Sequence, residues 1–404
     1  MQRFSDFIYG RVESDCETNK PFKVLLAFYG LIGIKAKPQG LLPTLHMVFF
    51  CIAYAYTPFL AIVGFLRYQK TATVTESLSA LQAFINAIFA AAKSVAVLVN
   101  FKRFQSVEPI MKSLDERYKT PEERQHITDS VTDCTRLYAA MGFIYYLYGL
   151  ISILTALIIH KQPFGGWYPF LDLISNPTVH FYSCLSFETW YLYFLLTAQY
   201  LHDVYPTLYM RTIRAHMQLL RERIGRLGVD PDKSDDENNK ELIDCIATHQ
   251  QILQVVDMVR SVCSPTIFMQ FVCVALVHCV CMVNIFVFAD TLNRVITIWY
   301  YLMVATQILP TCYEASTLEM ESSKLPVAIF HCNWLALDKR GRKLILFFIH
   351  HAQKEVTFVA MHLFEINMRT YLSIAKFSFT LYTFANEMGF GQNIKELAES
   401  KGKK

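Results

Sequence analysis

Residues 265–289 read PTIFMQFVCVALVHCVCMVNIFVFA and contain no charged side chain. A helix needs about 20 mainly apolar residues to cross the hydrocarbon core of a bilayer, so this stretch is long enough to span one. Other stretches of similar length and hydrophobicity occur along the chain. We expect seven membrane-spanning helices, near residues 41–66, 77–101, 137–160, 178–202, 265–289, 295–318 and 356–384. The predicted fold class is an all-α integral membrane protein.

The composition of the chain agrees with a membrane protein. Hydrophobic residues make up 53% of the 404 residues and charged residues only 18%, whereas a soluble domain carries about 25% charged residues. The net charge of +4 is small and no basic region stands apart, which argues against a nucleic-acid partner. The 11 cysteines include no CxxC pair and lie mostly in apolar segments, so we expect buried free thiols.

The distribution of Lys and Arg predicts the orientation in the membrane. The N-terminal segment and the connections after spans 2, 4 and 6 together hold 27 of these residues, and the opposite side holds 8. Basic connections stay in the cytoplasm. We therefore expect a cytoplasmic N-terminus and, because seven is odd, an extracellular C-terminus.

The long inner connections predict helical extensions below the membrane. Five apolar residues from Ile213 to Leu227 recur every three or four positions, which indicates one face of a helix whose stripe needs a partner in this subunit or a neighbour. We expect the following organisation: 1–40, cytoplasmic N-terminus with a short re-entrant or interfacial segment near Phe22–Ile34; 41–202, spans 1–4 with the ligand-binding part; 203–264, cytoplasmic helical anchor region with a mobile linker at 228–240; 265–318, spans 5–6; 319–355, cytoplasmic anchor region; 356–384, span 7; 385–404, extracellular tail.

The last span carries polar side chains every three or four positions, which places them on one helical face. They are Arg369, Ser373, Lys376, Thr380, Thr383 and Glu387. Ionisable groups in a span usually face water or a bundle interior. Two interpretations are open: the face lines an aqueous pore, or it is a buried polar seam between helices. A pore requires one such helix from each subunit of an oligomer.

The outer halves of spans 2, 3, 4 and 6 are rich in aromatic and small hydroxyl side chains. This mixture is typical of a pocket for a small apolar ligand. The candidate ligand-binding residues are Phe84, Ile88, Tyr148, Ser152, Thr155, Tyr182, Thr189, Trp299 and Met303. For any one of them, an aromatic belt or ordinary helix packing is the alternative.

Two further ionisable residues lie deep in spans. We expect Lys93 in span 2 to be salt-linked or to extend toward the interface. Glu188 in span 4 either faces a ligand cavity or reaches toward the outer interface.

Motifs of enzymes and metal sites are missing from the sequence. There is no HExxH, GxSxG or P-loop. His350-His351 lacks the i, i+4 spacing of a metal pair, and His278, Cys279 and Cys281 point in different directions on a helix. We expect neither catalysis nor a cofactor.

Three stretches carry a resemblance to a known family. They are HDVYPTLYMRTIRAHMQLLRERIGRLG (202–228), LPTCYEASTLEMESSKLPVAIFHCNWLALDKRGRKLILFFIHHAQ (309–353) and TYLSIAKFSFTLYTF (370–384), with the separate elements Pro310, Cys312, Trp334 and Ala352-Gln353. In this order, and with this topology, the chain resembles the insect odorant receptors. It departs from them at Lys354-Glu355, where family members often have a proline, and in its longer, more charged tail.

The resemblance implies a function beyond what the residues alone predict. It implies the odorant-binding subunit of a ligand-gated, non-selective cation channel that forms a heterotetramer with a shared co-receptor. It also implies an odorant pocket in the outer leaflet, a pore lined by the last helix, and contacts through the cytoplasmic anchor region. The expected location is the plasma membrane, in dendrites of olfactory sensory neurons. The short connection between spans 4 and 5 favours the tuning subunit over the co-receptor.

Three other classes fit the sequence less well. A G-protein-coupled receptor has the orientation opposite to the one that the charge distribution predicts. It also carries an Asp-Arg-Tyr after span 3 and an NPxxY in span 7, and this sequence has neither motif. Gustatory receptors carry Thr-Tyr and Gln-Phe in the last helix, where this chain has LYTFANEM (381–388). A transporter is expected to show inverted repeats or broken helices, and we find neither in this sequence.

Overall fold

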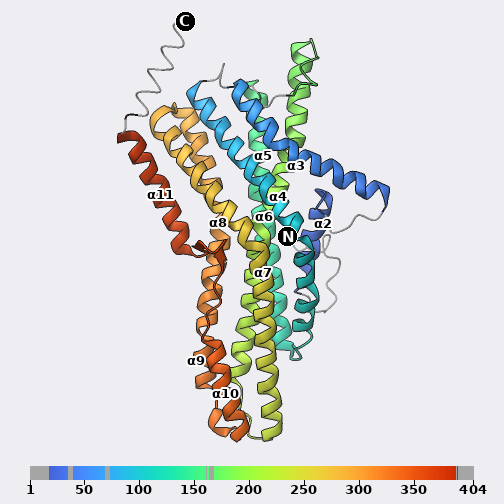
Figure 1. Ribbon diagram of the computed structural model, residues 1–404, viewed down its shortest axis with the longest axis vertical. Coiled ribbons are helices and arrows are strands. Elements are labelled where there is room, and N and C mark those ends of the chain that lie inside the picture. Colours follow the sequence, from blue (N-terminus) through green and yellow to red (C-terminus); the bar gives the residue numbers. More distant parts are fainter. Residues whose placement is uncertain are drawn as a thin grey trace.

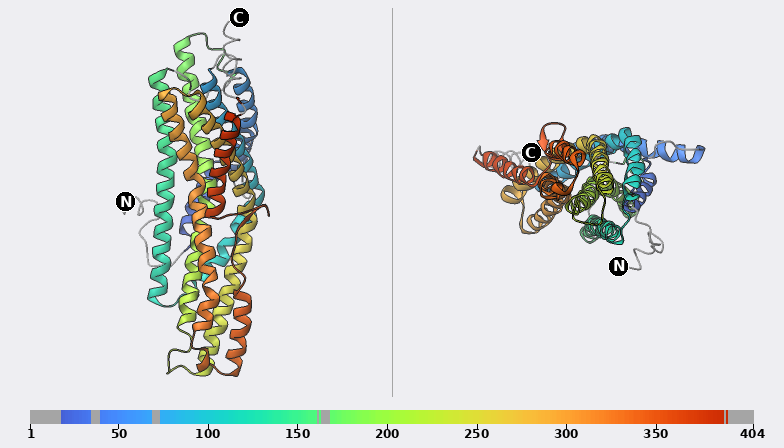
Figure 2. Two further views of the ribbon diagram at one scale, coloured as in Figure 1. Left: turned by 90° about the vertical axis from the view of Figure 1, so that its left-hand side faces the viewer. Right: turned by 90° about the horizontal axis from the view of Figure 1, so that it is seen from below.

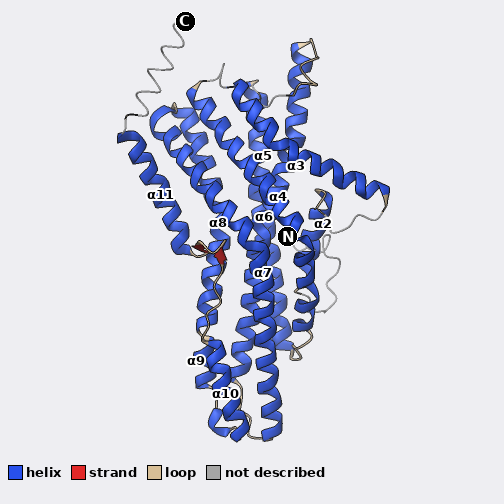
Figure 3. Cartoon of the chain, in the orientation of Figure 1, coloured by secondary structure: helices blue, strands red, loops and turns tan. Residues whose placement is uncertain are grey.

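The computed structural model describes residues 18–34, 40–68, 73–160, 162, 168–387 and 389. Long helices run side by side along the longest axis, and helix accounts for most of the described chain (Figures 1 and 3). The elements are α2 (Lys20–Leu31), α3 (Leu41–Tyr68), α4 (Val74–Asp115), α5 (Pro121–Ile159), α6 (Pro177–Gly225), α7 (Asp235–Val283), the π-helical turn η1 (Asn284–Phe288), α8 (Thr291–Ser323), α9 (Leu325–His331), the 3₁₀ turn η2 (Trp334–Ala336), α10 (Lys339–Ala352), the strands β1 (Val359–Ala360) and β2 (Phe364–Glu365), and α11 (Met368–Glu387).

All seven predicted membrane helices are present, as α3, α4, α5, α6, α7, α8 and α11. Five stretches are long and apolar enough by composition alone to cross a bilayer: Leu41–Arg67, Val74–Asp115, Pro121–Ile159, Asp235–Phe288 and Thr291–His331. Helix α6 is rich in tyrosine and contains Glu188, and α11 carries Arg369 and Lys376. These polar groups lower the mean hydropathy of the remaining two helices.

Several helices continue well beyond the length that a bilayer needs. The lower half of the molecule in Figure 1 is a bundle of the extended α6 and α7 with α8, α9 and α10, and the lower ends of α4 and α5 lie beside it. The apolar stripe of α6 is buried in this bundle, with Ile213, Leu220 and Leu227 in the main core. The stripe therefore finds its partner within the same subunit.

The linker expected at 228–240 is shorter in the structure, because α7 already begins at Asp235. The Ser234 hydroxyl accepts from the Glu237 backbone N–H, and the Glu237 carboxylate accepts from the Ser234 N–H. This capping box fixes the start of the helix. The preceding turn is also tied down, since the Asn333 amide donates to the Gly228 carbonyl at 2.7 Å.

Span 7 begins at Met368 and not near residue 356. The intervening segment forms a two-stranded antiparallel hairpin that pairs Val359 with Glu365 and Ala360 with Phe364. The Asn367 side chain then accepts a hydrogen bond from the Thr370 N–H at 2.9 Å. Asn in this position caps the first turn of a helix, which explains the late start of α11.

The short apolar segment near the N-terminus forms α2. Its buried residues include Phe22, Leu25 and Tyr29. The Phe22 ring stacks on Tyr209 of α6 with a centroid distance of 4.3 Å. Helix α2 is therefore packed against the bundle. The N-terminal residues before 18 and most of the tail expected at 385–404 lie outside the described residues.

Candidate functional site

Helix α11 lies at the edge of the bundle and packs on it with one face only (Figures 1 and 2). On that face Ser378 is fully buried and donates to the Ala275 carbonyl of α7 at 3.4 Å. Tyr371 and Ile374 pack against the main core beside it. The attachment to α7 and α8 therefore uses the face opposite the predicted polar stripe.

All six predicted pore residues lie on the face turned away from the bundle. Arg369, Ser373, Lys376, Thr380 and Glu387 are exposed, and Thr383 is partly exposed. A polar seam inside one subunit would be buried, so the second interpretation does not hold within this chain. Exposed apolar side chains flank the stripe on both sides: Leu372, Phe377, Phe379 and Phe384.

Both ends of α11 are tied to α7 and α8. At its start, the Met368 N–H donates to Ser316 of α8 at 2.9 Å. At its outer end, the Tyr382 ring lies 4.8 Å from Phe286 of η1, which continues α7. The helix that carries the polar stripe is therefore attached to α8 at its start and to the end of α7 at its outer end.

The structure buries part of the candidate ligand cluster and leaves part of it exposed. The Tyr148 ring of α5 lies 5.8 Å from the Tyr300 ring of α8, and Met303 is buried on α8. Ile88, Ser152, Thr155 and Thr189 are partly buried, and Phe84 stacks on Phe65 of α3 at 5.8 Å. Tyr182 and Trp299 are 49% and 48% exposed. These last two are therefore not part of the interior cluster.

Sequence reasoning missed three polar residues within this cluster. The Asn86 amide of α4 bonds to the Tyr300 hydroxyl, and the Cys273 thiol of α7 donates to the Asn86 side-chain oxygen at 3.4 Å. An amide in an apolar span is costly unless it is bonded, so Asn86 was a signal that the sequence did contain.

The two deep ionisable residues are both buried with partners. Lys93 pairs with Asp203 of α6 at 3.0 Å. Glu188 accepts a hydrogen bond from the Tyr168 hydroxyl at 3.1 Å. Of the two expectations for Lys93, the salt link is the one observed. Glu188 is buried and does not extend to the outer interface.

The described residues contain no group of three or more His, Cys, Asp and Glu that is arranged to hold a metal ion. The His278 ring stacks on Tyr301 at 4.1 Å, and His350 and His351 are exposed. The ten described cysteines are free thiols, and most are buried.

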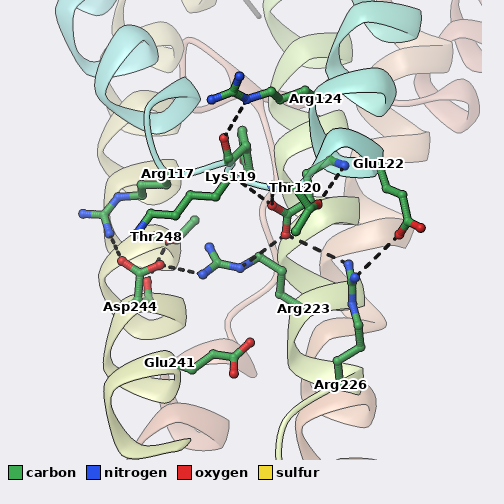
Figure 4. A network of polar contacts seen from close by, with 12 residues as sticks. Arg117, Lys119, Thr120, Glu122, Arg124, Arg223, Arg226, Glu241, Asp244 and Thr248 are labelled. Atoms are coloured by element: carbon green, nitrogen blue, oxygen red, sulfur yellow. Dashed lines mark hydrogen bonds and ion pairs between the residues drawn. The ribbon is translucent and has the colours of Figure 1, made fainter. Parts of the chain in front are cut away.

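An ionic cluster ties the cytoplasmic ends of four helices together (Figure 4). Asp244 of α7 lies between Arg117 at the end of α4 and Arg223 of α6. Arg223 also approaches Glu123 of α5 at 3.7 Å. These contacts link the cytoplasmic ends of α4, α5, α6 and α7.

Comparison with known proteins gives one consistent family. The family model described as "7tm Odorant receptor" matches residues 73–379. Odorant receptor 42a of Drosophila melanogaster is 31% identical over 85% of this chain and 84% of its own length, and Odorant receptor 59b of the same organism is 28% identical over 90% and 92%. The fold resembles the insect olfactory receptor OR5 from Machilis hrabei, with a TM-score of 0.74, 15% identity, and coverage of 91% of this chain and 97% of that one.

Proposed function

Because the chain belongs to the odorant receptor family, we propose that it is the odorant-binding subunit of a ligand-gated, non-selective cation channel. As a family member it is a seven-helix membrane receptor and not an enzyme. The assembly we propose is a heterotetramer with the shared co-receptor in the plasma membrane of olfactory dendrites. The gustatory and G-protein-coupled alternatives are not favoured, since the family match covers most of the chain.

The polar stripe of α11 carries the channel proposal. It faces away from its own bundle, so its ionisable groups need either water or neighbouring subunits beside them. A ring of four such helices around an axis would supply both, with Ser373, Lys376, Thr380 and Thr383 toward the ions. The apolar flanks would then contact the adjacent pore helices.

The inner part of the candidate cluster supports the ligand proposal. Its side chains offer apolar area with a few hydroxyls, which suits a small volatile molecule. A receptor of the same fold, OR5 of Machilis hrabei, has been solved in complex with eugenol. We propose a ligand of similar size here, held near Tyr148, Ser152 and Met303.

The cytoplasmic segment 319–355 is proposed as the anchor between subunits. Its exposed apolar residues include Val327, Phe330, Leu335, Leu346 and Phe347. Exposed apolar side chains grouped on one region favour a protein interface.

The test is to co-express the chain with an insect co-receptor and record currents over an odorant panel. We expect currents that require this chain, and a shifted reversal potential for Lys376→Gln and for Thr383→Val. Tyr371→Phe, on the packed face of α11, is the matched control and should leave the reversal potential unchanged. Absence of any current dependent on this chain would overturn the proposal. Unchanged permeation in surface-expressed Lys376→Gln and Thr383→Val would overturn the pore role of α11.

Orientation separates the channel from a G-protein-coupled receptor. An epitope tag at the C-terminus should be stained in intact cells. A tag that is stained only after permeabilisation would contradict the proposed topology.

A further inference from the structure

A chain of buried hydrogen bonds crosses the bundle in the membrane region. The ammonium of Lys93 on α4, whose side chain is 0% exposed, lies 3.0 Å from Asp203 on α6 and 2.5 Å from the side-chain oxygen of Gln270 on α7. Tyr145 on α5 donates to the other Asp203 oxygen at 2.5 Å. Gln270 donates to Gln307 on α8 at 2.9 Å. One donor–acceptor chain therefore joins α5, α6, α4, α7 and α8.

The two charged groups of this hydrogen-bond chain, Lys93 and Asp203, are compensated by each other and by neutral donors and acceptors. The Asp203 carboxylate accepts from both the ammonium and the Tyr145 phenol. The Gln270 oxygen accepts from Lys93 and also from Gln199 at 3.3 Å. Replacing a buried ion pair by well-packed apolar residues is often neutral or even stabilising. Packing alone therefore does not account for a charged pair at this depth, where ionisable residues usually mark function.

A second buried set extends the connection to α2. The Ser94 hydroxyl donates to the Ala90 carbonyl at 2.8 Å, so it accepts from the His202 Nε2–H at 2.9 Å. The Nδ1 atom of His202 then accepts from the Tyr29 hydroxyl at 3.2 Å. Ser94 and His202 directly neighbour Lys93 and Asp203 in the sequence, which places both sets at one level of the bundle.

The candidate ligand cluster lies on the outer side of this level. On three helices, a cluster residue precedes or follows a network residue by three to five positions: Ile88 and Lys93 on α4, Tyr148 and Tyr145 on α5, Met303 and Gln307 on α8. At 1.5 Å per residue these separations are about 4–8 Å along each helix. The hydrogen-bond chain therefore forms the inner floor of the candidate ligand region.

The far end of the hydrogen-bond chain lies on the helices to which the proposed pore helix α11 is attached. Gln270 and Gln307 belong to α7 and α8, the helices to which α11 is attached through Ser378 and Met368. The Lys93–Gln270 bond joins α4 to α7 within this network, and the Gln199–Gln270 bond joins α6 to α7 beside it.

We propose that the Lys93–Asp203 pair and its glutamine neighbours couple odorant binding to movement of the pore helix. This inference rests on the proposed function and adds the route by which the same site is regulated. An odorant that displaces α4 or α5 shifts the ammonium relative to Gln270, and α7 and α8 move with it. These are positioning residues, since they touch neither the odorant nor the permeating ion.

The first experiment compares two adjacent tyrosines of α5 in receptors co-expressed with the co-receptor. Tyr145→Phe removes the hydrogen bond to Asp203 and should shift the half-maximal odorant concentration about threefold or more, as expected for loss of one bond to a charged group. Tyr146→Phe is the matched control, because its hydroxyl contacts Thr197 outside the network at 3.1 Å. The control should leave the odorant response unchanged, and both variants should keep the wild-type reversal potential.

The second experiment neutralises the pair. Lys93→Met leaves a buried carboxylate without its counter-charge, which lowers the amount of folded receptor at the surface. Lys93→Met combined with Asp203→Leu removes both charges and should restore the surface amount while the half-maximal concentration stays shifted by about tenfold, within the usual range of coupling between sites. Gln307→Met tests the far end of the hydrogen-bond chain and leaves the Lys93–Asp203 pair intact. If the double variant fails to reach the surface, a shifted half-maximal odorant concentration in Gln307→Met still separates coupling from a structural role.

A purely structural role predicts a different pattern. Current would then follow the surface amount, and the half-maximal odorant concentration would stay at the wild-type value in Tyr145→Phe, Gln307→Met and the double variant. That result overturns the coupling inference alone. A wild-type chain that gives no odorant-evoked current overturns the proposed function as well.

Discussion

The guanidinium of Arg223 on α6 lies 2.6 Å from the carboxylate of Asp244 on α7, and Arg117 contacts the same carboxylate from the end of α4. One acidic side chain thus contacts two arginines where three helices meet. Replacing it leaves both cations without their shared partner. Asp244→Ala should therefore lower the free energy of unfolding by about 1–3 kcal/mol.

The measurement is thermal unfolding of the detergent-solubilised receptor. Asp257→Ala is the matched control on the same helix. Its carboxylate is 71% exposed and pairs with Arg260 three residues on, so its loss should cost less than about 1 kcal/mol. Equal melting temperatures for the two variants would show that the shared carboxylate has no special part in holding the lower bundle.

Gly228 gives a prediction about backbone geometry. Its φ is +69°, and a Cβ placed there would lie 2.6 Å from the backbone oxygen of Asn333. Gly228→Ala should therefore destabilise the receptor by about 1–3 kcal/mol, through both the left-handed backbone and the displaced contact. Gly225→Ala, where a Cβ meets no atom within 4 Å, should be neutral or slightly stabilising. Similar melting temperatures for both alanine variants would contradict the close approach.

Buried histidines in the cytoplasmic bundle predict a loss of stability in mild acid. Burial and the nearby His351 lower the pKa of His249 from 6.5 to about 4, and burial and His126 lower the pKa of His216 to about 3. As the pH falls below 6.5, the unfolded chain gains protons that the folded chain does not. For His249 alone this costs about 2 kcal/mol by pH 5.

A single substitution tests this pH dependence. In His249→Phe the new ring keeps the packing on Phe348, which lies 5.5 Å from the histidine ring. The melting temperature of this variant should fall less between pH 7 and pH 5 than that of the wild type. His331→Gln, at an exposed position, should keep the wild-type slope. A slope that is the same in His249→Phe and wild type would rule out His249 as a source.

The membrane helices could be predicted from the sequence because each one is a long apolar stretch. The polar stripe of α11 could be predicted because its members are spaced three or four residues apart along one helix. Two helix starts were also encoded, in the Ser234–Glu237 capping box and in Asn367, but these short signals were outweighed by the longer apolar and polar runs around them. Local patterns thus give the elements more reliably than their ends.

The partners within the site were not readable, because they depend on contacts between distant parts of the chain. Lys93 and Asp203 are 110 positions apart, and no local pattern joins them. On α8 the prediction chose Trp299, whereas Tyr300 is the ring that meets Tyr148. Adjacent helical residues point about 100° apart, so the choice requires knowing which side of α8 the bundle covers.

The interior and surface members of the candidate ligand cluster should behave differently. Tyr148→Ala removes a ring that packs on Tyr300 between α5 and α8, and it should shift the half-maximal odorant concentration by about tenfold, since a buried aromatic side chain supplies much of the apolar contact with a ligand. Tyr182→Ala removes a ring that is half exposed on α6, and it should leave the response within about twofold of wild type. Both are measured as concentration–response curves with the co-receptor, at matched surface expression, with the reversal potential as the check that permeation is unchanged. A larger shift for Tyr182→Ala than for Tyr148→Ala would place the odorant on the outer surface of α6 and not between α5 and α8.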